Sequence, residues 1–244
     1  FSDGRTTECS GEHLWRVHHR SWSEPRTLTT LDTLALLQRQ RYQKRLWIDQ
    51  PDGNFGSHAE LPISPWALGL LLAEGDLTNM KVSSSDQAII TKLKKELGDE
   101  YILNQINSYD YRIAMAKEAR TRGSREPVPL REALKDLNLR DTHSYDKFIP
   151  TAYKQASRDD RIAVLQGLLD GDGWAEQHKS VRFASTSEQL ADDVIELVRS
   201  LGGWASKRQK ITHYTHKSEY KAGRPAFVVN INIASPEVLF SLER

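Results

Sequence analysis

The feature that most constrains the fold is an internal repeat. Residues 67–76, Ala-Leu-Gly-Leu-Leu-Leu-Ala-Glu-Gly-Asp, recur as residues 164–173, Val-Leu-Gln-Gly-Leu-Leu-Asp-Gly-Asp-Gly. The sequence downstream of each copy also recurs: the serine-rich segment 82–87 is similar to segment 183–189. A unit that appears twice with its flanking sequence indicates two similar structural halves.

Each copy continues in the same way. An amphipathic helical pattern comes next and ends at Leu-Gly, at 97–98 and at 201–202, where glycine closes a helix. Hydroxyl-x-x-acid patterns, Ser83 with Asp86 and Ser185 with Glu188, predict the caps that begin these helices. Strand-like segments come after the helices, at 109–116 and 227–233. The sequence therefore predicts an α+β fold with two αββαββα-like halves.

The repeated helices carry small residues four apart, Gly69 with Ala73 and Gly167 with Gly171. Such residues share one helix face and allow two backbones to approach closely. A glycine inside a helix costs about 1 kcal/mol relative to alanine, so a glycine at the same place twice indicates a packing requirement. We expect the two helices to pack on each other. The alternative is two unrelated buried helices with incidental glycines.

Each repeated helix ends in a carboxylate directly before a glycine, Glu74 and Asp172. If the helices pair, these like charges approach each other at the negative ends of two helix dipoles. A hard divalent cation with oxygen ligands relieves this repulsion. We therefore expect one or two Mg²⁺ ions, bound by the two carboxylates and by carbonyls of Ala73, Gly75, Gly171 and Gly173. Metal-assisted phosphodiester hydrolysis is the chemistry that such a site favours.

Charge is unevenly distributed, although 34 Lys+Arg nearly balance 33 Asp+Glu. Residues 16–45 hold seven cations against two acids, residues 112–125 five against one, and residues 199–224 seven against one. Aromatic residues interleave with these segments. A basic face on the folded protein would suit binding of phosphate. Each segment by itself is also compatible with solvated surface charge. The candidate DNA-binding residues are Arg41, Lys44, Arg45, Arg112, Lys117, Lys207, Arg208, Lys210, Lys217, Lys221 and Arg224.

The two repeats resemble the LAGLIDADG motif, as Leu-Gly-Leu-Leu-Leu-Ala-Glu-Gly in the first copy and Leu-Gln-Gly-Leu-Leu-Asp-Gly-Asp-Gly in the second. The first copy departs from the motif in having Leu72 at the first acidic position. The resemblance covers roughly residues 62–244 and implies a pseudo-two-fold, single-chain homing endonuclease. In such enzymes two saddle-shaped antiparallel sheets bind adjacent major grooves, and the acids cut both strands to leave short 3′ overhangs. It also implies a long, mostly asymmetric target, and Ca²⁺ binding without cleavage in place of Mg²⁺ or Mn²⁺.

Two further segments resemble the intein-borne branch of that family. Lys147-Phe148-Ile149-Pro150 resembles the Lys-x-Ile-Pro run before the second motif, which places Lys147 at the active site, where it polarises water or stabilises phosphorane charge. A surface lysine before a proline is the alternative. After Ile233 no lysine appears as its second-half counterpart, so this role is lost, lies beyond Arg244, or passes to Lys207 or Lys221.

The N-terminal stretch from Phe1 through His13 resembles the intein splicing block that carries a histidine. Splicing needs a nucleophile at the start and an asparagine at the end, and this chain has neither, so we expect no self-splicing. The alternative for His13 is an ordinary strand histidine. A turn at Asp3-Gly4 predicts a hairpin within residues 1–20, the Leu31, Leu34 and Leu37 spacing predicts a helix within 27–41, and residues 51–54 predict a turn.

We expect three regions: an N-terminal intein-like remnant and accessory DNA-contacting region (1–61), a first LAGLIDADG half (62–157) and a second (158–244). The composition, 38% hydrophobic and 27% charged, is that of a globular protein. One cysteine excludes an internal disulfide, and the longest apolar run, residues 66–73, is too short to span a bilayer. We expect an intracellular, DNA-associated monomer with double-stranded DNA as partner and no membrane. The competing functions are a cleavage-defective DNA- or RNA-binding protein (maturase or regulator) and a protein-splicing element.

Overall fold

The computed structural model describes residues 1, 4–50, 53–57, 60–116, 128–176, 180–216 and 219–242, with the side chains at 214–220 excepted. The chain divides into two compact units, Phe1–Pro51 and Asp52–Arg244. The break between units therefore comes earlier than the expected boundary after residue 61. The expected division of the second unit at residue 158 stays a prediction.

The first unit is a three-stranded antiparallel sheet with one helix. Strand β1 (Leu14–His19) lies between β2 (Arg26–Thr29) and β3 (Leu46–Ile48). The hairpin is thus β1–β2 and not the expected one around Asp3-Gly4, where Asp3 lies outside the described residues. Helix α1 (Thr30–Leu37) begins later than the pattern predicted, because residues 26–29 pair with β1.

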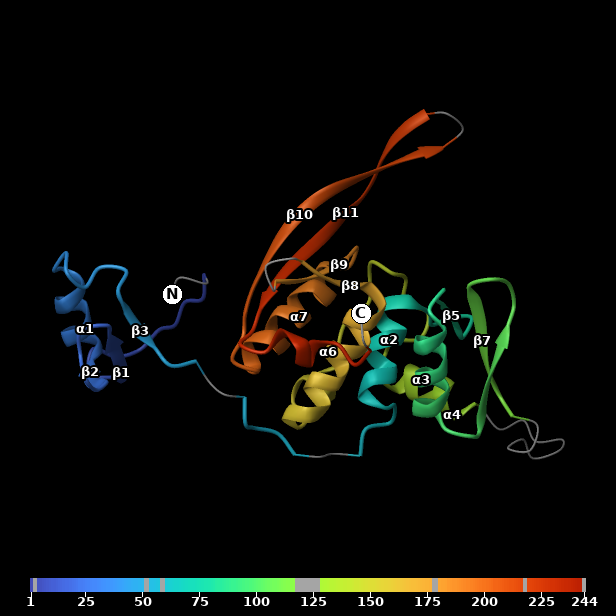
Figure 1. Ribbon diagram of the computed structural model, residues 1–244, viewed down its shortest axis with the longest axis horizontal. Helices are drawn as coiled ribbons and strands as arrows, with labels where there is room; N and C mark the ends of the chain where they lie inside the picture. Colours follow the sequence, from blue (N-terminus) through green and yellow to red (C-terminus); the bar gives the residue numbers. More distant parts are fainter. Residues whose placement is uncertain are drawn as a thin grey trace. The chain divides into compact units, whose positions relative to one another are not determined.

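The first half of the second unit has the predicted order of elements (Figure 1). Helix α2 precedes a four-stranded antiparallel sheet of order β4-β5-β7-β6, with helix α3 between β5 and β6 and helix α4 after β7. The elements are α2 (Pro65–Glu74), β4 (Gly75–Asp76), β5 (Lys81–Ser83), α3 (Gln87–Leu97), β6 (Tyr101–Gln105), β7 (Asp110–Met115) and α4 (Pro129–Asp136).

The second half repeats that order after the short helix α5 (Thr151–Lys154). Its antiparallel sheet has the order β8-β9-β11-β10, which matches the first sheet strand for strand. The expected α+β fold with two equivalent halves is therefore confirmed. The elements are α6 (Arg158–Asp172), β8 (Gly173–Ala175), β9 (Val181–Ser185), α7 (Glu188–Ser200), β10 (Trp204–His216), β11 (Glu219–Asn232) and the 3₁₀ turn η1 (Pro236–Leu239).

The helices downstream of each repeat begin later than the predicted caps. Asp86 itself is the N-cap of α3, and its side chain accepts from the Ala88 amide at 2.8 Å. Ser187 is the N-cap of α7, where its hydroxyl accepts from the Leu190 amide. Both serine-rich segments first complete a strand, which moves the helix start. The predicted glycine ends are correct, because Gly98 and Gly202 adopt φ values of +83° and +81°.

Helices α2 and α6 pack directly on each other and join the two halves (Figure 1). A Cβ atom placed on Gly69 would lie 2.2 Å from the Val164 carbonyl oxygen, and one on Gly167 would lie 2.0 Å from the Trp66 carbonyl oxygen. Both distances are too short for any side chain. The repeated glycines thus mark the closest approach of the two backbones, as the sequence predicted.

We expect Gly167→Ala to lower the free energy of unfolding by about 3 kcal/mol, because the added methyl group meets backbone that repacking cannot move cheaply. The gain in helix propensity, about 1 kcal/mol, offsets only part of this cost. Urea denaturation measures the change. Lys95→Ala, on the exposed face of α3, is the control and should stay within about 0.5 kcal/mol of the parent. An unchanged midpoint for Gly167→Ala would contradict the close packing.

The helix pair also contains a buried acid. Asp170, which is fully buried, accepts from the Trp66 indole nitrogen of α2 at 2.8 Å. It also accepts from the backbone amide of Ser241 at 3.1 Å and from the Ser241 hydroxyl. The first acidic position of the second motif therefore connects both helices to the C-terminal segment. Leu72, at the matching position of α2, is an ordinary buried residue.

Candidate active site

The two acids of the repeats lie at the adjacent ends of the paired helices. Glu74 is the last residue of α2 and Asp172 the last of α6. A Cβ atom placed on Gly171 would lie 2.6 Å from the Ala73 Cβ and 3.1 Å from the Glu74 Cγ. The end of α6 therefore lies against the end of α2, and the carboxylates of both halves come to one place.

Lys147 lies at this place. Its side chain is buried, and its ammonium donates to the carbonyl oxygens of Leu72 at 2.9 Å, Gly75 at 2.7 Å and Leu71 at 3.3 Å. These are the carbonyls at the C-terminal end of α2, where a cation is favoured by the helix dipole. The alternative of a surface lysine is wrong. The ammonium binds the helix end, and Gly75, a predicted metal ligand, is one of its acceptors.

The charges of the site influence one another. Burial lowers the pKa of Lys147 to about 8. The carboxylate of Asp172 opposes that shift most strongly, and those of Glu74 and Asp76 oppose it less. Burial raises the pKa of Asp172, and Lys147 partly reverses this rise. Lys147 is thus a cation that interacts with acids of both halves and limits the rise in the pKa of Asp172.

A pocket of about 290 Å³ opens beside these groups. Asp172 has an exposed side chain, yet the pKa of its carboxyl rises because protein atoms displace water around it. A carboxylate that faces a pocket from a partly dehydrated position has both properties. The pocket is lined by Leu72, Ala73, Ser144, Lys147, Asp172, Ala184, Ser185, Thr186 and Ala226.

The donor set is suited to a divalent metal that also binds substrate. In the described part of the chain no three His, Cys, Asp or Glu side chains gather in a way that could hold a metal by themselves. Mg²⁺ is commonly bound through one or two carboxylates together with water and substrate phosphates. Glu74 and Asp172, the predicted ligands, would supply the carboxylates. The carbonyls of Ala73, Gly75, Gly171 and Gly173 remain predicted ligands.

The alternation of β10 divides its predicted DNA-binding residues between two faces. Lys207 pairs with the fully buried Val229 and binds Glu188 and Asp192 of α7 at 2.8 Å. Lys207 therefore lies on the helix-covered face and not on the open one, which revises the prediction. It is also not available as a second active-site lysine. Arg208 and Lys210 have exposed side chains, and Arg208 points to the opposite face from Lys207 because strand side chains alternate.

Two cations on the open faces were missed from the sequence. Lys81 on β5 pairs across the ladder with the exposed Arg112 and lies 3.9 Å from Asp76. In the second half, Arg182 on β9 binds Glu176 at 2.9 Å. Lys81 and Arg182 each precede the first apolar residue of the aligned repeat segments, Val82 and Phe183. The repeat alignment, extended by one residue, would have found both.

The other predicted DNA-binding residues that the structure describes are exposed. Lys221 and Arg224 are exposed on β11. In the first unit Arg41, Lys44 and Arg45 are exposed between α1 and β3, and Arg41 donates to the Ser21 hydroxyl at 3.0 Å. Lys117 and Lys217 lie outside the described residues. His13 is exposed, with its ring 4.6 Å from that of Trp15.

Comparison with known proteins places the second half in a family. Residues 159–235 match the model of the LAGLIDADG-like domain. This part of the chain is a LAGLIDADG-like domain. The match spans α6 through β11, the elements that carry Asp172 and the second sheet. Within the described residues no helix has the length and apolar character needed to cross a membrane.

A curated relative, the replicative DNA helicase DnaB of Mycobacterium intracellulare, is 23% identical over 270 residues. The alignment covers all of this chain but only 40% of that protein's length. Among solved structures, this chain is similar to I-DmoI in complex with DNA and Mn, at 16% identity and a TM-score of 0.43, over 75% of this chain and 98% of that one. It is also similar to the N-terminal LAGLIDADG domain of WhiA, at 11% identity and a TM-score of 0.37, over 80% and 88%.

Proposed function

We propose that this protein is a site-specific DNA endonuclease that cuts both strands of a long, mostly asymmetric target and leaves short 3′ overhangs. The observation that carries the proposal is the meeting of Glu74, Asp172 and Lys147 at the paired helix ends. Two sheets with exposed cations flank that place, as a duplex with two strands to cut requires.

Glu74 and Asp172 would bind Mg²⁺ or Mn²⁺, and a bound metal supplies Lewis-acid stabilisation and an activated water. Lys147 holds the end of α2, so that Glu74 keeps its position, and its charge keeps the pKa of Asp172 from rising further. Ca²⁺ should support DNA binding without cleavage. Because one chain carries both acids, we propose that it acts as a monomer, inside the cell and on DNA.

We further propose that the target lies in the gene of a replicative DNA helicase. The whole chain aligns within 40% of the length of such a protein, and the segments around His13 and Lys147 resemble intein segments. A nuclease carried inside a helicase gene product accounts for both. The amino-acid sequence has no Gly-x-x-x-x-Gly-Lys-Ser/Thr phosphate-binding motif, so the helicase activity of that relative is not proposed for this chain.

The second candidate is a DNA- or RNA-binding protein, such as a maturase or regulator, that does not cut. One observation favours it: the Lys147 ammonium is bound by three backbone carbonyls, which leaves it no further proton to donate. The presence of both carboxylates favours the endonuclease, because a protein that only binds phosphate gains nothing from two acids near it.

The test is cleavage of a supercoiled plasmid that carries the uninterrupted DnaB gene of Mycobacterium intracellulare. We expect linear product with Mg²⁺ or Mn²⁺ and bound but intact plasmid with Ca²⁺. The empty plasmid is the control. Specific binding of the gene without cleavage in any of the three metals would select the second candidate. Cleavage of both plasmids alike would contradict the proposed target.

A further inference from the structure

The backbone that carries Lys147 is attached to α7, a helix of the second half. The hydroxyl of Ser187, a fully buried residue at the N-cap of α7, donates to the carbonyl of Lys147 at 2.6 Å. Two residues farther along, the Ile149 amide donates to the Asp193 carboxylate of the same helix at 2.8 Å. Asp193 is also buried. Buried side chains of α7 therefore hold the chain on both sides of Phe148.

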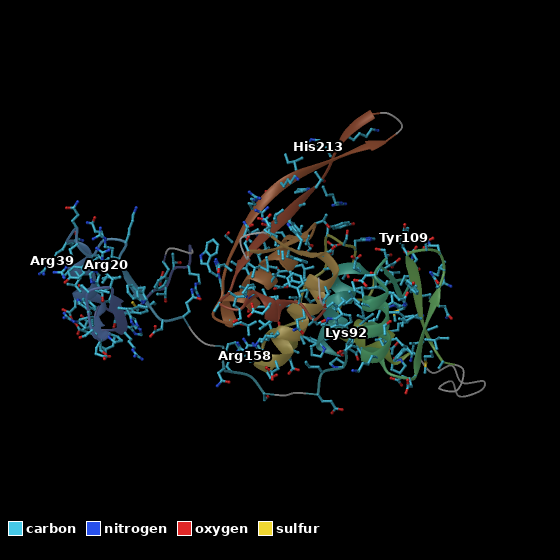
Figure 2. The ribbon with its side chains drawn as sticks, in the orientation of Figure 1. Arg20, Arg39, Lys92, Tyr109, Arg158 and His213 are labelled. Carbon is cyan, nitrogen blue, oxygen red and sulfur yellow. The ribbon has the colours of Figure 1, made fainter. Side chains whose placement is uncertain are left out.

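The same stretch of chain is attached to both ends of α2 in the first half. The Lys147 ammonium donates to the carbonyls at the C-terminal end of α2. Near the other end, the Tyr153 hydroxyl donates to the Ile63 carbonyl at 2.8 Å and accepts from the Ile63 amide at 3.0 Å. Residues 147–154, which we call the connecting segment, thus link α7 to α2. They precede α6, whose first residue, Arg158, is labelled in Figure 2.

Asp193 is the centre of the attachment to α7. The Lys154 ammonium, at the end of the connecting segment, binds Asp193 at 2.9 Å and the exposed Glu196 at 2.7 Å. The Gln189 side chain donates to Asp193 at 3.0 Å. A buried carboxylate requires hydrogen bonds to its oxygens, and two of the donors that Asp193 receives, the Ile149 amide and the Lys154 ammonium, come from the connecting segment. The carboxylate therefore fixes that segment at two points.

This attachment determines where the Lys147 ammonium can reach. A lysine side chain is a flexible four-carbon chain, so it can bind a defined set of carbonyls only when its backbone is held at a suitable distance from them. The bonds from Ser187 and Asp193 hold the backbone at residues 147 and 149. Without them the ammonium could leave the end of α2, where Glu74 lies.

We propose that Ser187 and Asp193 are positioning residues of the active site, which hold the connecting segment so that Lys147 reaches the end of α2. The inference rests on the proposed endonuclease function and adds to it a dependence of one half on the other. Side chains of a second-half helix fix the end of the first-half helix that carries Glu74. Both residues act through Lys147, so their effects on cleavage should disappear when Lys147 is replaced.

The first test measures the position of Lys147 without any cleavage. Metal-free protein is treated briefly with formaldehyde and a borane reductant, and the methylation of each lysine is followed by mass spectrometry. Ser187→Gly removes the hydroxyl but keeps a residue that N-caps tolerate. Asp193→Asn keeps the size of the side chain but has a single acceptor oxygen, so it cannot serve both Ile149 and Lys154. We expect Lys147 to be methylated about fivefold faster in each variant, the weight of roughly one hydrogen bond.

Glu196→Gln is the matched control, because Glu196 lies on the same helix and binds Lys154 from an exposed position. This variant should methylate at Lys147 like the parent. Lys207, which binds Glu188 and Asp192 of α7, reports whether the helix itself has loosened. An unchanged rate at Lys147 in both variants, or an equal rise at Lys207, would overturn the inference.

The second test measures the cleavage of each strand of an end-labelled duplex from the helicase gene. Ser187→Gly and Asp193→Asn should slow the same strand as Lys147→Met, by roughly tenfold, because a displaced ammonium costs less than a missing one. Added to Lys147→Met, either substitution should change that rate by less than about twofold, since residues that act through one contact are not additive. Full additivity would overturn the inference. A parent that cuts no DNA would overturn the proposed function, while the methylation rates would still decide whether α7 positions Lys147.

Discussion

Asp172→Asn and Glu74→Gln are each expected to lower double-strand cleavage by at least about a hundredfold, the scale at which loss of one electrostatic group at an active site acts. Each substitution keeps the size of the side chain and removes the negative charge that would bind the metal. DNA binding should be retained within about threefold, because the acids lie at the helix ends, whereas exposed cations proposed to contact DNA lie on the sheets.

The matched control is Asp159→Asn. Asp159 lies in the first turn of α6, at the opposite end of the helix that carries Asp172, and it is exposed. This variant should cut at the parent rate. Filter binding and plasmid cleavage, measured on the same preparations, separate the two effects. If binding fell in parallel with cleavage in Asp172→Asn, the acid would be structural, and the metal site would have to be sought elsewhere.

The sequence predicted those parts of the fold that depend on one strong local signal. The glycines at 69 and 167 predicted the closest approach of α2 and α6, because only a backbone contact requires a missing Cβ at the same place twice. The same repeat placed Glu74 and Asp172 together. Helix starts were less predictable, because Ser83 and Ser185 fit a capping pattern but end strands in the structure.

The hydrogen-bond partners of buried polar side chains could not be predicted from the sequence. Asp170 looked like one more acid of the motif, yet it accepts hydrogen bonds from Trp66 and Ser241, which lie far away in the chain. Arg161 is fully buried and donates to carbonyls of residues 53, 55, 156 and 200. Contacts between distant segments depend on the assembled topology, and no spacing in the sequence reports them.

The sequence also did not reveal on which face of its sheet each strand residue lies. The basic segment 199–224 predicted a surface for phosphate, but one residue of register decides whether a lysine meets DNA or a helix. Lys207 binds Glu188 and Asp192, whereas Arg208 beside it is exposed. The buried neighbours Ala205 and Val229 fix that register. Their burial results from α7 packing on the sheet, which the charge pattern could not indicate.

The two DNA strands are expected to be cut at different rates. The acids differ in length, Glu74 against Asp172, and a longer carboxylate holds a metal in a different position. Lys147 is placed unequally with respect to the two acids: it donates to the carbonyls at the end of α2, although its strongest favourable charge interaction is with Asp172. A nicked intermediate should therefore accumulate on a supercoiled plasmid.

Lys147→Met should increase this difference, because it keeps the length of the side chain, removes the cation and leaves the α2 carbonyls without their donor. We expect the rate for one strand to fall roughly a hundredfold, a few kcal/mol in barrier height, and the rate for the other to fall less. End-labelled duplex identifies which strand slows, a readout that a general loss of stability would not change selectively. Lys95→Met is the control. Equal slowing of both strands would mean that Lys147 acts on the two sites alike, and simultaneous cleavage with no nicked species in either protein would mean that the two sites are equivalent.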